Sequence, residues 1–431
     1  MVPEPLRLKR TLGTFDGLAV VVGIMIGSGI FRTPGLVAAR LGSPGLTFLA
    51  WGLGGAVGLL GAFVFAELAT RLPQAGGKYV YAREAYGRRA AFVIGWIEAL
   101  GIYCVASAAI GVVCGEYLAR LAGWPAERAR LAGAVFVLLF TAVNLAGVGL
   151  GRLVQNVTTA AKVVALLAVI VAAGVWGSGA GWSAGPTAPS GALLGALAVA
   201  FQSVIWTYYG YPDAAKIAEE VVEPDRTLPR IFLTAIAAVT ALYLLLNAAF
   251  LHLLPFERIA SSKLVAGDAM EALFGARAGA ITTALALLVV LAGLNGNLFV
   301  TPRVVFGMAR DGLAPAALAR VHAGGAPWTA VALVGLLTAL LAATGTFERL
   351  LSVAIVFVLA TDAFMVPVLF RLRRRGPAPF RVPFSPVLPL AFLAIYAALF
   401  AGAALEQPGV ALLAAGGLGG AYLLARYSVT A

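Results

Sequence analysis

The sequence predicts an all-helical protein that crosses a membrane many times. Of its 431 residues, 61% are hydrophobic and 12% are charged, whereas a soluble domain carries roughly 25% charged residues. Apolar runs of about 20 residues, the length of a membrane-spanning helix, recur along the whole chain. The distribution of lysine and arginine among the loops between these runs also argues against a nucleic-acid-binding role for the net charge of +12.

Twelve apolar segments are long enough to be spans. They lie near residues 14–38, 45–70, 91–119, 130–148, 154–176, 191–217, 231–254, 278–300, 327–345, 350–370, 386–405 and 409–426. With the N-terminus in the cytoplasm, most basic residues fall in cytoplasmic loops, so the positive-inside rule places both termini inside. The short basic start, MVPEPLRLKRTLG, lacks the cleavage site of a signal peptide. We therefore expect the first helix to be retained.

The first span is interrupted near its middle by the sequence GIMIGSGIF, where Gly27, Ser28 and Gly29 stand together. A break in a membrane helix leaves backbone N–H and C=O groups unpaired, which is costly unless a ligand or a water-lined cavity satisfies them. A zwitterion meets both needs, because its carboxylate accepts from N–H groups and its ammonium donates to carbonyls. The segment therefore indicates transport of a small solute charged at both ends. Close helix–helix packing is the alternative that small residues leave open.

The third span holds both cysteines, Cys104 and Cys114, which are ten residues apart on one helix and so cannot pair with each other. The sequence has no Cys/His metal cluster, no phosphate-binding loop and no nucleophile–base pair. We therefore expect no metal, no cofactor and no enzymatic activity.

Lys162 lies about ten residues into the fifth span, or about 15 Å at 1.5 Å per residue. That depth is half of a hydrocarbon core about 30 Å thick. An unpaired ammonium there is costly, so we expect Lys162 to face the bundle interior with acceptors nearby. It either replaces a bound sodium ion as a fixed charge, carries a proton, or serves as a purely structural cation.

The sixth span, FQSVIWTYYGYPDAAKIAEEV, carries Gly210 and Pro212 within an aromatic run. Proline removes a helical hydrogen bond and disrupts the preceding turn. Because spans 1 and 6 are five apart, two copies of a five-span unit would be inverted, and matching breaks in inverted halves indicate a transporter's binding site. A proline kink without function is the alternative. Four aromatic residues flank the break and either line a cavity or serve as packing: Trp206, Tyr208, Tyr209 and Tyr211.

Other charged groups lie near the ends or within the depth of the spans. We expect Glu67 and Glu98 to form helix-end or interhelical ion pairs. Lys216 is expected to pair with Glu220, four residues further on, and to act as a gate or cap. Asp362 lies deep in the tenth span, and its role is left open.

Five motifs follow one another along the chain: GIMIGSGIFRTPG at 23–35, AELATRLPQAGGKYVYAREAYG at 66–87, QNVTTAAK at 155–162, EEVVEPDRTLPR at 219–230 and TPRVVFGMARDGLAP at 301–315. In this order they resemble those of the amino acid–polyamine–organocation (APC) superfamily, in particular prokaryotic relatives of the L-type amino acid transporters. The resemblance covers most of the chain. It implies a LeuT-type fold with 12 transmembrane helices in a single domain, residues 1–431. That domain would consist of a first five-helix repeat at 14–176, an inverted repeat at 191–370 and two extra helices at 386–426.

The resemblance also implies how a substrate is held. Backbone N–H groups of the first break would bind the carboxylate, and carbonyls at Ile24 and in the Trp206–Tyr209 stretch would take the amino group. Trp206 matches the family's aromatic gate. Lys162 matches the lysine that occupies a sodium site in sodium-independent members and links helix 5 to the unwound part of helix 1. The substrate-binding residues implied in this way are Ile24, Gly27, Ser28, Gly29, Trp206, Tyr208, Tyr209 and Gly210.

The chain departs from the family pattern after Gly210, where Tyr211 and Pro212 replace the usual tryptophan and small polar residue. Tyr209 stands where relatives often have glycine or an acidic residue. A ring there would narrow the pocket and favour small side chains, unless it rotates away. The loop near residues 120–130 lacks the cysteine by which animal relatives attach an ancillary subunit, so we expect no disulfide-linked heavy chain.

We therefore expect sodium-independent transport of neutral, small to medium L-amino acids by alternating access in a bacterial or archaeal plasma membrane. Exchange is favoured over proton symport, which remains the alternative if Lys162 titrates. An amine or polyamine carrier is a second alternative, against which the carboxylate-binding motif argues. A non-transporting amino acid sensor is a third. The expected partners are the amino acid and the lipid bilayer.

Overall fold

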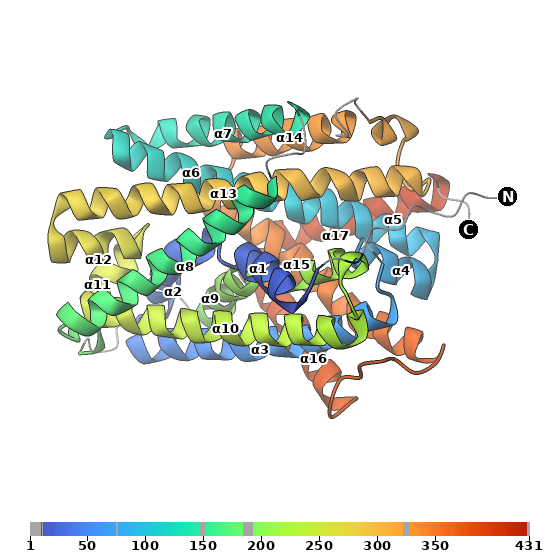
Figure 1. Ribbon diagram of the computed structural model, residues 1–431, viewed down its shortest axis with the longest axis horizontal. Coiled ribbons are helices and arrows are strands. Elements are labelled where there is room, and N and C mark those ends of the chain that lie inside the picture. Colours follow the sequence, from blue (N-terminus) through green and yellow to red (C-terminus); the bar gives the residue numbers. More distant parts are fainter. Residues whose placement is uncertain are drawn as a thin grey trace.

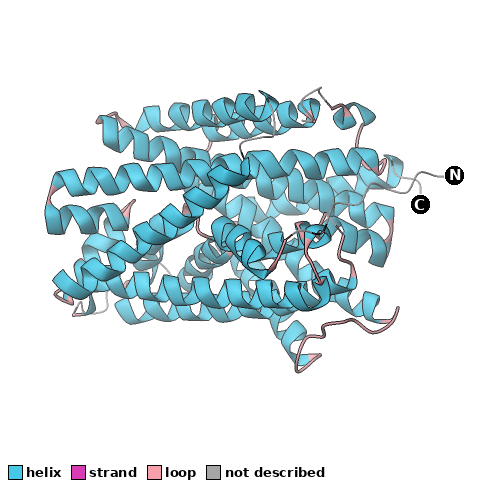
Figure 2. Cartoon of the chain, in the orientation of Figure 1, coloured by secondary structure: helices cyan, strands magenta, loops and turns pink. Residues whose placement is uncertain are grey.

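The computed structural model describes residues 10, 12–74, 76–146, 151–183, 193–321 and 327–428, and the side chains of 126, 146, 151–161, 193–194 and 428 lie outside this description. These ranges consist of helices joined by loops and turns, as Figure 2 shows. The β pairing among the described residues is an isolated parallel bridge between Leu12 and Val221. The fold class predicted from composition is therefore confirmed at the level of an all-helical chain.

The helices follow one another along the chain with short connections. Those before residue 190 are α1 (Thr14–Met25), α2 (Gly29–Leu41), α3 (Pro44–Arg71), α4 (Lys78–Tyr86), α5 (Arg88–Trp96), the π-helix η1 (Ile97–Cys104), α6 (Val105–Ala122), α7 (Ala126–Ala146), α8 (Gly151–Trp176) and the 3₁₀ helix η2 (Ala180–Trp182). Those after residue 190 are α9 (Leu193–Tyr208), the 3₁₀ helices η3 (Tyr211–Lys216) and η4 (Ala218–Glu220), α10 (Pro224–Leu253), α11 (Phe256–Ser261), α12 (Val265–Phe274), α13 (Ala276–Arg310), the 3₁₀ helix η5 (Ala316–Ala319), α14 (Trp328–Thr344), α15 (Phe347–Arg373), α16 (Val387–Glu406) and α17 (Pro408–Ser428).

Eight of the described helices are long and apolar enough to cross a membrane, and the bent pair α1 and α2 makes a ninth candidate. Shorter apolar helices cover Lys162–Trp176 and Trp328–Thr344. Each of the apolar segments predicted from the sequence overlaps one of the helices. The chain is therefore a multi-pass membrane protein.

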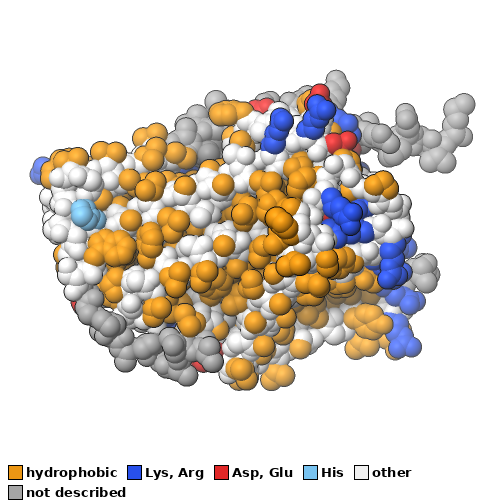
Figure 3. Space-filling view, turned by 90° about the horizontal axis from the view of Figure 1, so that it is seen from below, with side chains coloured by type: hydrophobic (Ala, Val, Ile, Leu, Met, Phe, Trp, Pro, Cys, Tyr) orange, Lys and Arg blue, Asp and Glu red, His pale blue; other side chains and the backbone are white. Residues whose placement is uncertain are grey.

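The long helices run side by side, and both termini lie at the same end of the bundle (Figure 1). Most lysine and arginine side chains on the face drawn in Figure 3 gather at that end, while apolar side chains cover the middle. This is the distribution that the positive-inside rule requires if that end faces the cytoplasm.

Glycines let α3 approach its neighbours closely. In lipid no hydrophobic force drives helices together, so contacts between helices depend on the close packing that small residues allow. A Cβ added to Gly58 would lie 2.7 Å from the side chain of Ile236 on α10. At Gly54 it would collide with Val204 on α9, and at Gly61 with Tyr211 on η3. Helix α3 thus positions the end of α9 and the segment that follows it.

Candidate functional site

The first predicted break is present. Helix α1 ends at Met25 and α2 begins at Gly29, with a bend of 45° between them. The N–H of Gly27 turns back to the carbonyl of Met25 at 3.0 Å, and Ser28 is almost completely buried. The break therefore sets the carbonyl end of α1 beside the N–H end of α2. These ends carry partial charges of opposite sign.

The second predicted break follows α9, which ends at Tyr208. Gly210 has a φ of 131°, a conformation that side chains disfavour, and Pro212 lies in the 3₁₀ helix η3 that follows. The proline cannot donate the hydrogen bond that would continue α9 as a regular helix. Glycine and proline together thus explain why the helix stops here.

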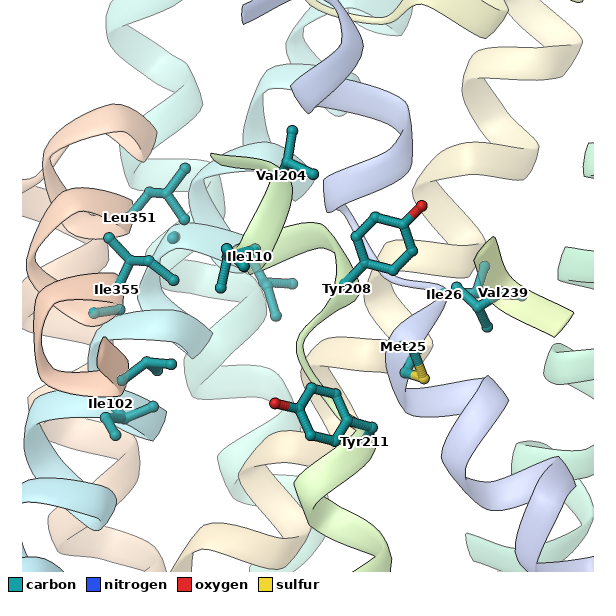
Figure 4. Close-up of a cluster of buried hydrophobic side chains, with 14 of the residues drawn as sticks. Met25, Ile26, Ile102, Ile110, Val204, Tyr208, Tyr211, Val239, Leu351 and Ile355 are labelled. Atoms are coloured by element: carbon teal, nitrogen blue, oxygen red, sulfur yellow. The ribbon is translucent and has the colours of Figure 1, made fainter. Parts of the chain in front are cut away.

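The two breaks lie against each other. A Cβ added to Gly29 would be 2.8 Å from the hydroxyl of Thr207, and one added to Gly210 would be 3.1 Å from the backbone nitrogen of Met25. Figure 4 shows Met25 and Ile26 beside the link that joins Tyr208 to Tyr211. The residues implied to bind substrate are thereby brought to one place near the centre of the bundle, and four of them are only partly buried: Ile24, Gly27, Trp206 and Tyr209.

Two side chains hold the end of α1 in position. The ammonium of Lys162 on α8 is buried and donates to the carbonyl of Gly23 at 3.2 Å. The hydroxyl of Tyr243 on α10 donates to the carbonyl of Met25 at 2.9 Å. Lys162 thus faces the bundle interior, and the residue of α1 that it contacts lies two residues before the end of that helix. The other residues of its motif, 155–161, have side chains outside the described part of the chain.

The tyrosines at the second break point in different directions. Tyr208 is buried, and its hydroxyl donates to the carbonyl of Trp51 on α3 at 3.0 Å. Its ring therefore points toward α3, and its backbone is the part that lies at the break. Tyr209 is half-buried, and its hydroxyl accepts a hydrogen bond from Lys78 at 2.9 Å.

Lys78 is a buried residue that sequence reasoning did not single out. It begins α4, and its ammonium lies 2.8 Å from the carboxylate of Asp362, which is buried on α15. Burial alone would lower the pKa of Lys78, but the negative charges of Asp362, Glu98 and Asp213 together outweigh that effect and the pKa is raised. The sequence offered one signal for Lys78: it directly follows the Gly76–Gly77 turn and begins a helix, so its side chain can lie inside the bundle and not in a loop.

The predicted pair between Lys216 and Glu220 is wrong. Lys216 contacts Asp213 at 2.8 Å and Glu98 at 3.6 Å, and it also contacts the hydroxyl of Tyr103. The spacing rule of an α-helix does not apply, because η3 is a 3₁₀ helix that ends at Lys216. Burial and the charge of Glu219 raise the pKa of Glu220.

Other ion pairs lie toward the two ends of the bundle. Glu67 binds Arg373 of α15 at 2.6 Å and Arg71 at 3.0 Å, which confirms the predicted interhelical pairing. At the end opposite the termini, Arg32 of α2 contacts Glu348 of α15 at 2.5 Å and Glu116 of α6 at 3.5 Å. These contacts connect α3 with α15 at one end of the bundle, and α2 with α6 and α15 at the other.

A multi-pass helical protein with two broken helices meeting at its centre has the architecture of a solute transporter. The chain matches the amino acid permease family over residues 12–412. It belongs to that family, and is a transporter rather than an enzyme.

Curated relatives agree with this assignment. The serine/threonine exchanger SteT of Bacillus subtilis is 30% identical over 402 residues, which cover 91% of each chain. The human large neutral amino acids transporter small subunit 2 is 32% identical over 73% of this chain and 60% of its own length. The mouse Asc-type amino acid transporter 1 is 31% identical over 74% of this chain and 62% of its own length. The chain thus matches about three-fifths of the length of these two mammalian relatives.

Proposed function

We propose that this protein exchanges small neutral L-amino acids across a bacterial or archaeal plasma membrane, without sodium, by alternating access. We also propose that it has the LeuT-type fold: 12 transmembrane helices, with repeats at 14–176 and 191–370, two extra helices at 386–426 and both termini in the cytoplasm. It would work without a disulfide-linked heavy chain.

The observation that carries the proposal is the contact between the two breaks. The carbonyl end of α1 and the carbonyl end of α9 lie beside the N–H end of α2, where Gly29 approaches Thr207 and Gly210 approaches Met25. A zwitterion bound there would place its carboxylate on the N–H groups near Ser28 and its ammonium on the carbonyls near Ile24 and Trp206. Trp206 would act as the gate over it.

Sodium independence is supported by the ammonium of Lys162, which is hydrogen-bonded to Gly23 at 3.2 Å. A cation of the protein already sits at the end of α1, so no dissolved cation is needed to satisfy that carbonyl. A fixed charge of this kind favours exchange, because it does not travel with the substrate.

A preference for small side chains is supported by the tyrosine beside the second break. The hydroxyl of Tyr209 is held by Lys78, which keeps the ring where it narrows the space for a substrate side chain. The match to a serine/threonine exchanger is consistent with this size range.

Counterflow in proteoliposomes tests the proposal. Vesicles loaded with serine should take up labelled serine, threonine and alanine without sodium, and empty vesicles should take up very little. Uptake into empty vesicles that follows a pH gradient would replace exchange with proton symport. Competition by decarboxylated analogues as strong as that by amino acids would support an amine carrier. Binding of amino acids without movement of any of them would support a sensor.

A further inference from the structure

A groove lies between α15 and α16 on the side of the bundle, near the end that carries the termini. It has a volume of about 370 Å³, and all of its lining residues are apolar. Phe364, Pro367 and Phe370 of α15 form one wall, and Leu390 and Leu393 of α16 form the other. Leu390 is 47% exposed, so the groove is open to the surroundings of the helices. We call it the α15–α16 groove.

The face of α15 that lines the groove continues into exposed arginines. Positions three, four and seven residues apart share one face of an α-helix. Arg371 is seven residues after Phe364, and Arg374 is seven residues after Pro367. Both arginines are exposed, and so are two more in the link that leads to α16. We call these four residues the basic rim: Arg371, Arg374, Arg375 and Arg381.

The protein neutralises little of the charge of the basic rim. Arg375 lies 3.5 Å from Glu84, whereas the other three arginines of the rim have no carboxylate of a described residue within ion-pair distance. Arg373, which stands between them in the sequence, is bound to the buried Glu67 at 2.6 Å. The packing thus pairs the arginine that points inward and leaves those that point outward for an anion outside the chain.

Tyr86 joins the basic rim to the groove. Its ring packs against Phe364 with the ring centroids 5.4 Å apart, and the guanidinium of Arg371 lies 4.7 Å from the centroid of the same ring. Tyr86 ends α4 and is 40% exposed. Positive charge and open apolar surface therefore adjoin here, as the headgroup and the chain of one amphipathic molecule require.

The link after α15 adds an exposed aromatic side chain. Phe384 is 82% exposed, although the link is held to the bundle, where the N–H of Val382 donates to Glu67 at 2.8 Å. Figure 1 shows this link, in orange, projecting from the side of the bundle, and Figure 3, drawn from that side, shows basic side chains beside apolar ones at that end. An apolar side chain held outward in this way is stabilised by lipid and not by water.

We propose that the α15–α16 groove and the basic rim together bind an anionic phospholipid of the leaflet at this end of the bundle. An acyl chain lies in the groove, and the phosphate accepts hydrogen bonds from Arg371 and Arg374. A zwitterionic lipid binds less well, because the rim repels its ammonium group. A soluble phosphate leaves the groove unfilled. A second copy of this chain is disfavoured, since a symmetric contact through this face brings two basic rims together.

The bound lipid braces two helices near the centre of the bundle. Tyr86 belongs to α4 and Phe364 to α15, and a lipid that contacts both rings holds these helices together. The buried pair between Lys78 and Asp362 joins the same two helices. An anionic lipid is therefore expected to stabilise the fold, whatever the protein transports.

Native mass spectrometry of the full-length protein measures the bound lipid. The wild type should retain phosphatidylglycerol, which is anionic, in preference to phosphatidylcholine with the same chains. Each arginine contributes about fivefold to the binding of an anionic lipid, so Arg371→Gln/Arg374→Gln should bind phosphatidylglycerol about 25-fold more weakly. Arg128→Gln/Arg130→Gln, a pair of exposed arginines on α7 near the opposite end, is the matched control and should bind it as the wild type does. Equal affinities in the two double variants would overturn the proposal.

A second pair of variants tests the groove. Ala363→Trp should occupy part of it and release the lipid, whereas Ala397→Trp, at an exposed position of α16, should retain it. Glycerophosphoglycerol, which is the headgroup without chains, should not displace the lipid. Full retention in Ala363→Trp, or displacement by the free headgroup, would overturn the role of the groove. A dimer that dissociates when the arginines are replaced would assign the face to a second copy instead.

Thermal unfolding keeps the proposal testable if Ala363→Trp does not fold. Phosphatidylglycerol should raise the unfolding temperature of the wild type and of Arg128→Gln/Arg130→Gln, but not that of Arg371→Gln/Arg374→Gln. An equal rise in all three proteins, or the same rise with phosphatidylcholine, would show that the basic rim does not select the lipid.

Discussion

Replacing Lys162 by methionine should weaken substrate binding and exchange while leaving the protein folded. Methionine keeps much of the apolar stem but removes the ammonium that donates to the carbonyl of Gly23 at 3.2 Å. That carbonyl lies two residues before the end of α1. Without the hydrogen bond, the carbonyl end of α1 is no longer tied to α8.

The expected magnitude follows from the kind of contact that is lost. A hydrogen bond to a charged group contributes about 1.5 to 3 kcal/mol. Since about 1.4 kcal/mol corresponds to a tenfold change in an equilibrium constant, exchange at low substrate concentration should fall by about 10-fold to about 100-fold. Stability should fall less than binding does, because the removed ammonium also carried a cost of burial.

Counterflow of labelled serine and thermal stabilisation by serine measure the two effects separately. Lys263→Met is the matched control: the Lys263 side chain is 67% exposed and 3.7 Å from Glu116, so little should change. Equal serine affinity and equal exchange rates in Lys162→Met and the wild type would refute the reasoning, because the contact with α1 would then have no part in transport.

Three further substitutions test the geometry. Trp206→Ala should raise the KM for serine exchange if the ring closes over the substrate, whereas an unchanged KM would show that it only packs. Gly210→Ala should destabilise the protein by about 1 to 3 kcal/mol, because alanine disfavours a φ of 131°; Gly409→Ala, where a Cβ would meet open space, is the control for thermal unfolding. Glu67→Gln should lower the unfolding temperature far more than Glu84→Gln, because Glu67 is completely buried between Arg71 and Arg373 and breaking such a pair costs about 3 to 5 kcal/mol; similar unfolding temperatures for the two variants would contradict that reasoning.

The sequence by itself determined the helices and the places where two of them stop. Apolar runs of span length, the small residues at 27–29, and Gly210 with Pro212 are properties of neighbouring residues, and neighbours decide whether a backbone can continue as a helix. The depth of Lys162 in its span was also readable, because helix rise converts residue number into distance. These inferences needed no knowledge of packing.

Only the tertiary structure decided which groups meet. Lys78 and Asp362 are 284 residues apart in the sequence and form a buried pair, and Lys216 turns to Asp213 and Glu98 rather than to Glu220. The ring of Tyr208 points to Trp51, which no local pattern indicates. A buried charge is stabilised by whichever partner the packing brings within a few ångströms, and that partner is set by helices far away along the chain.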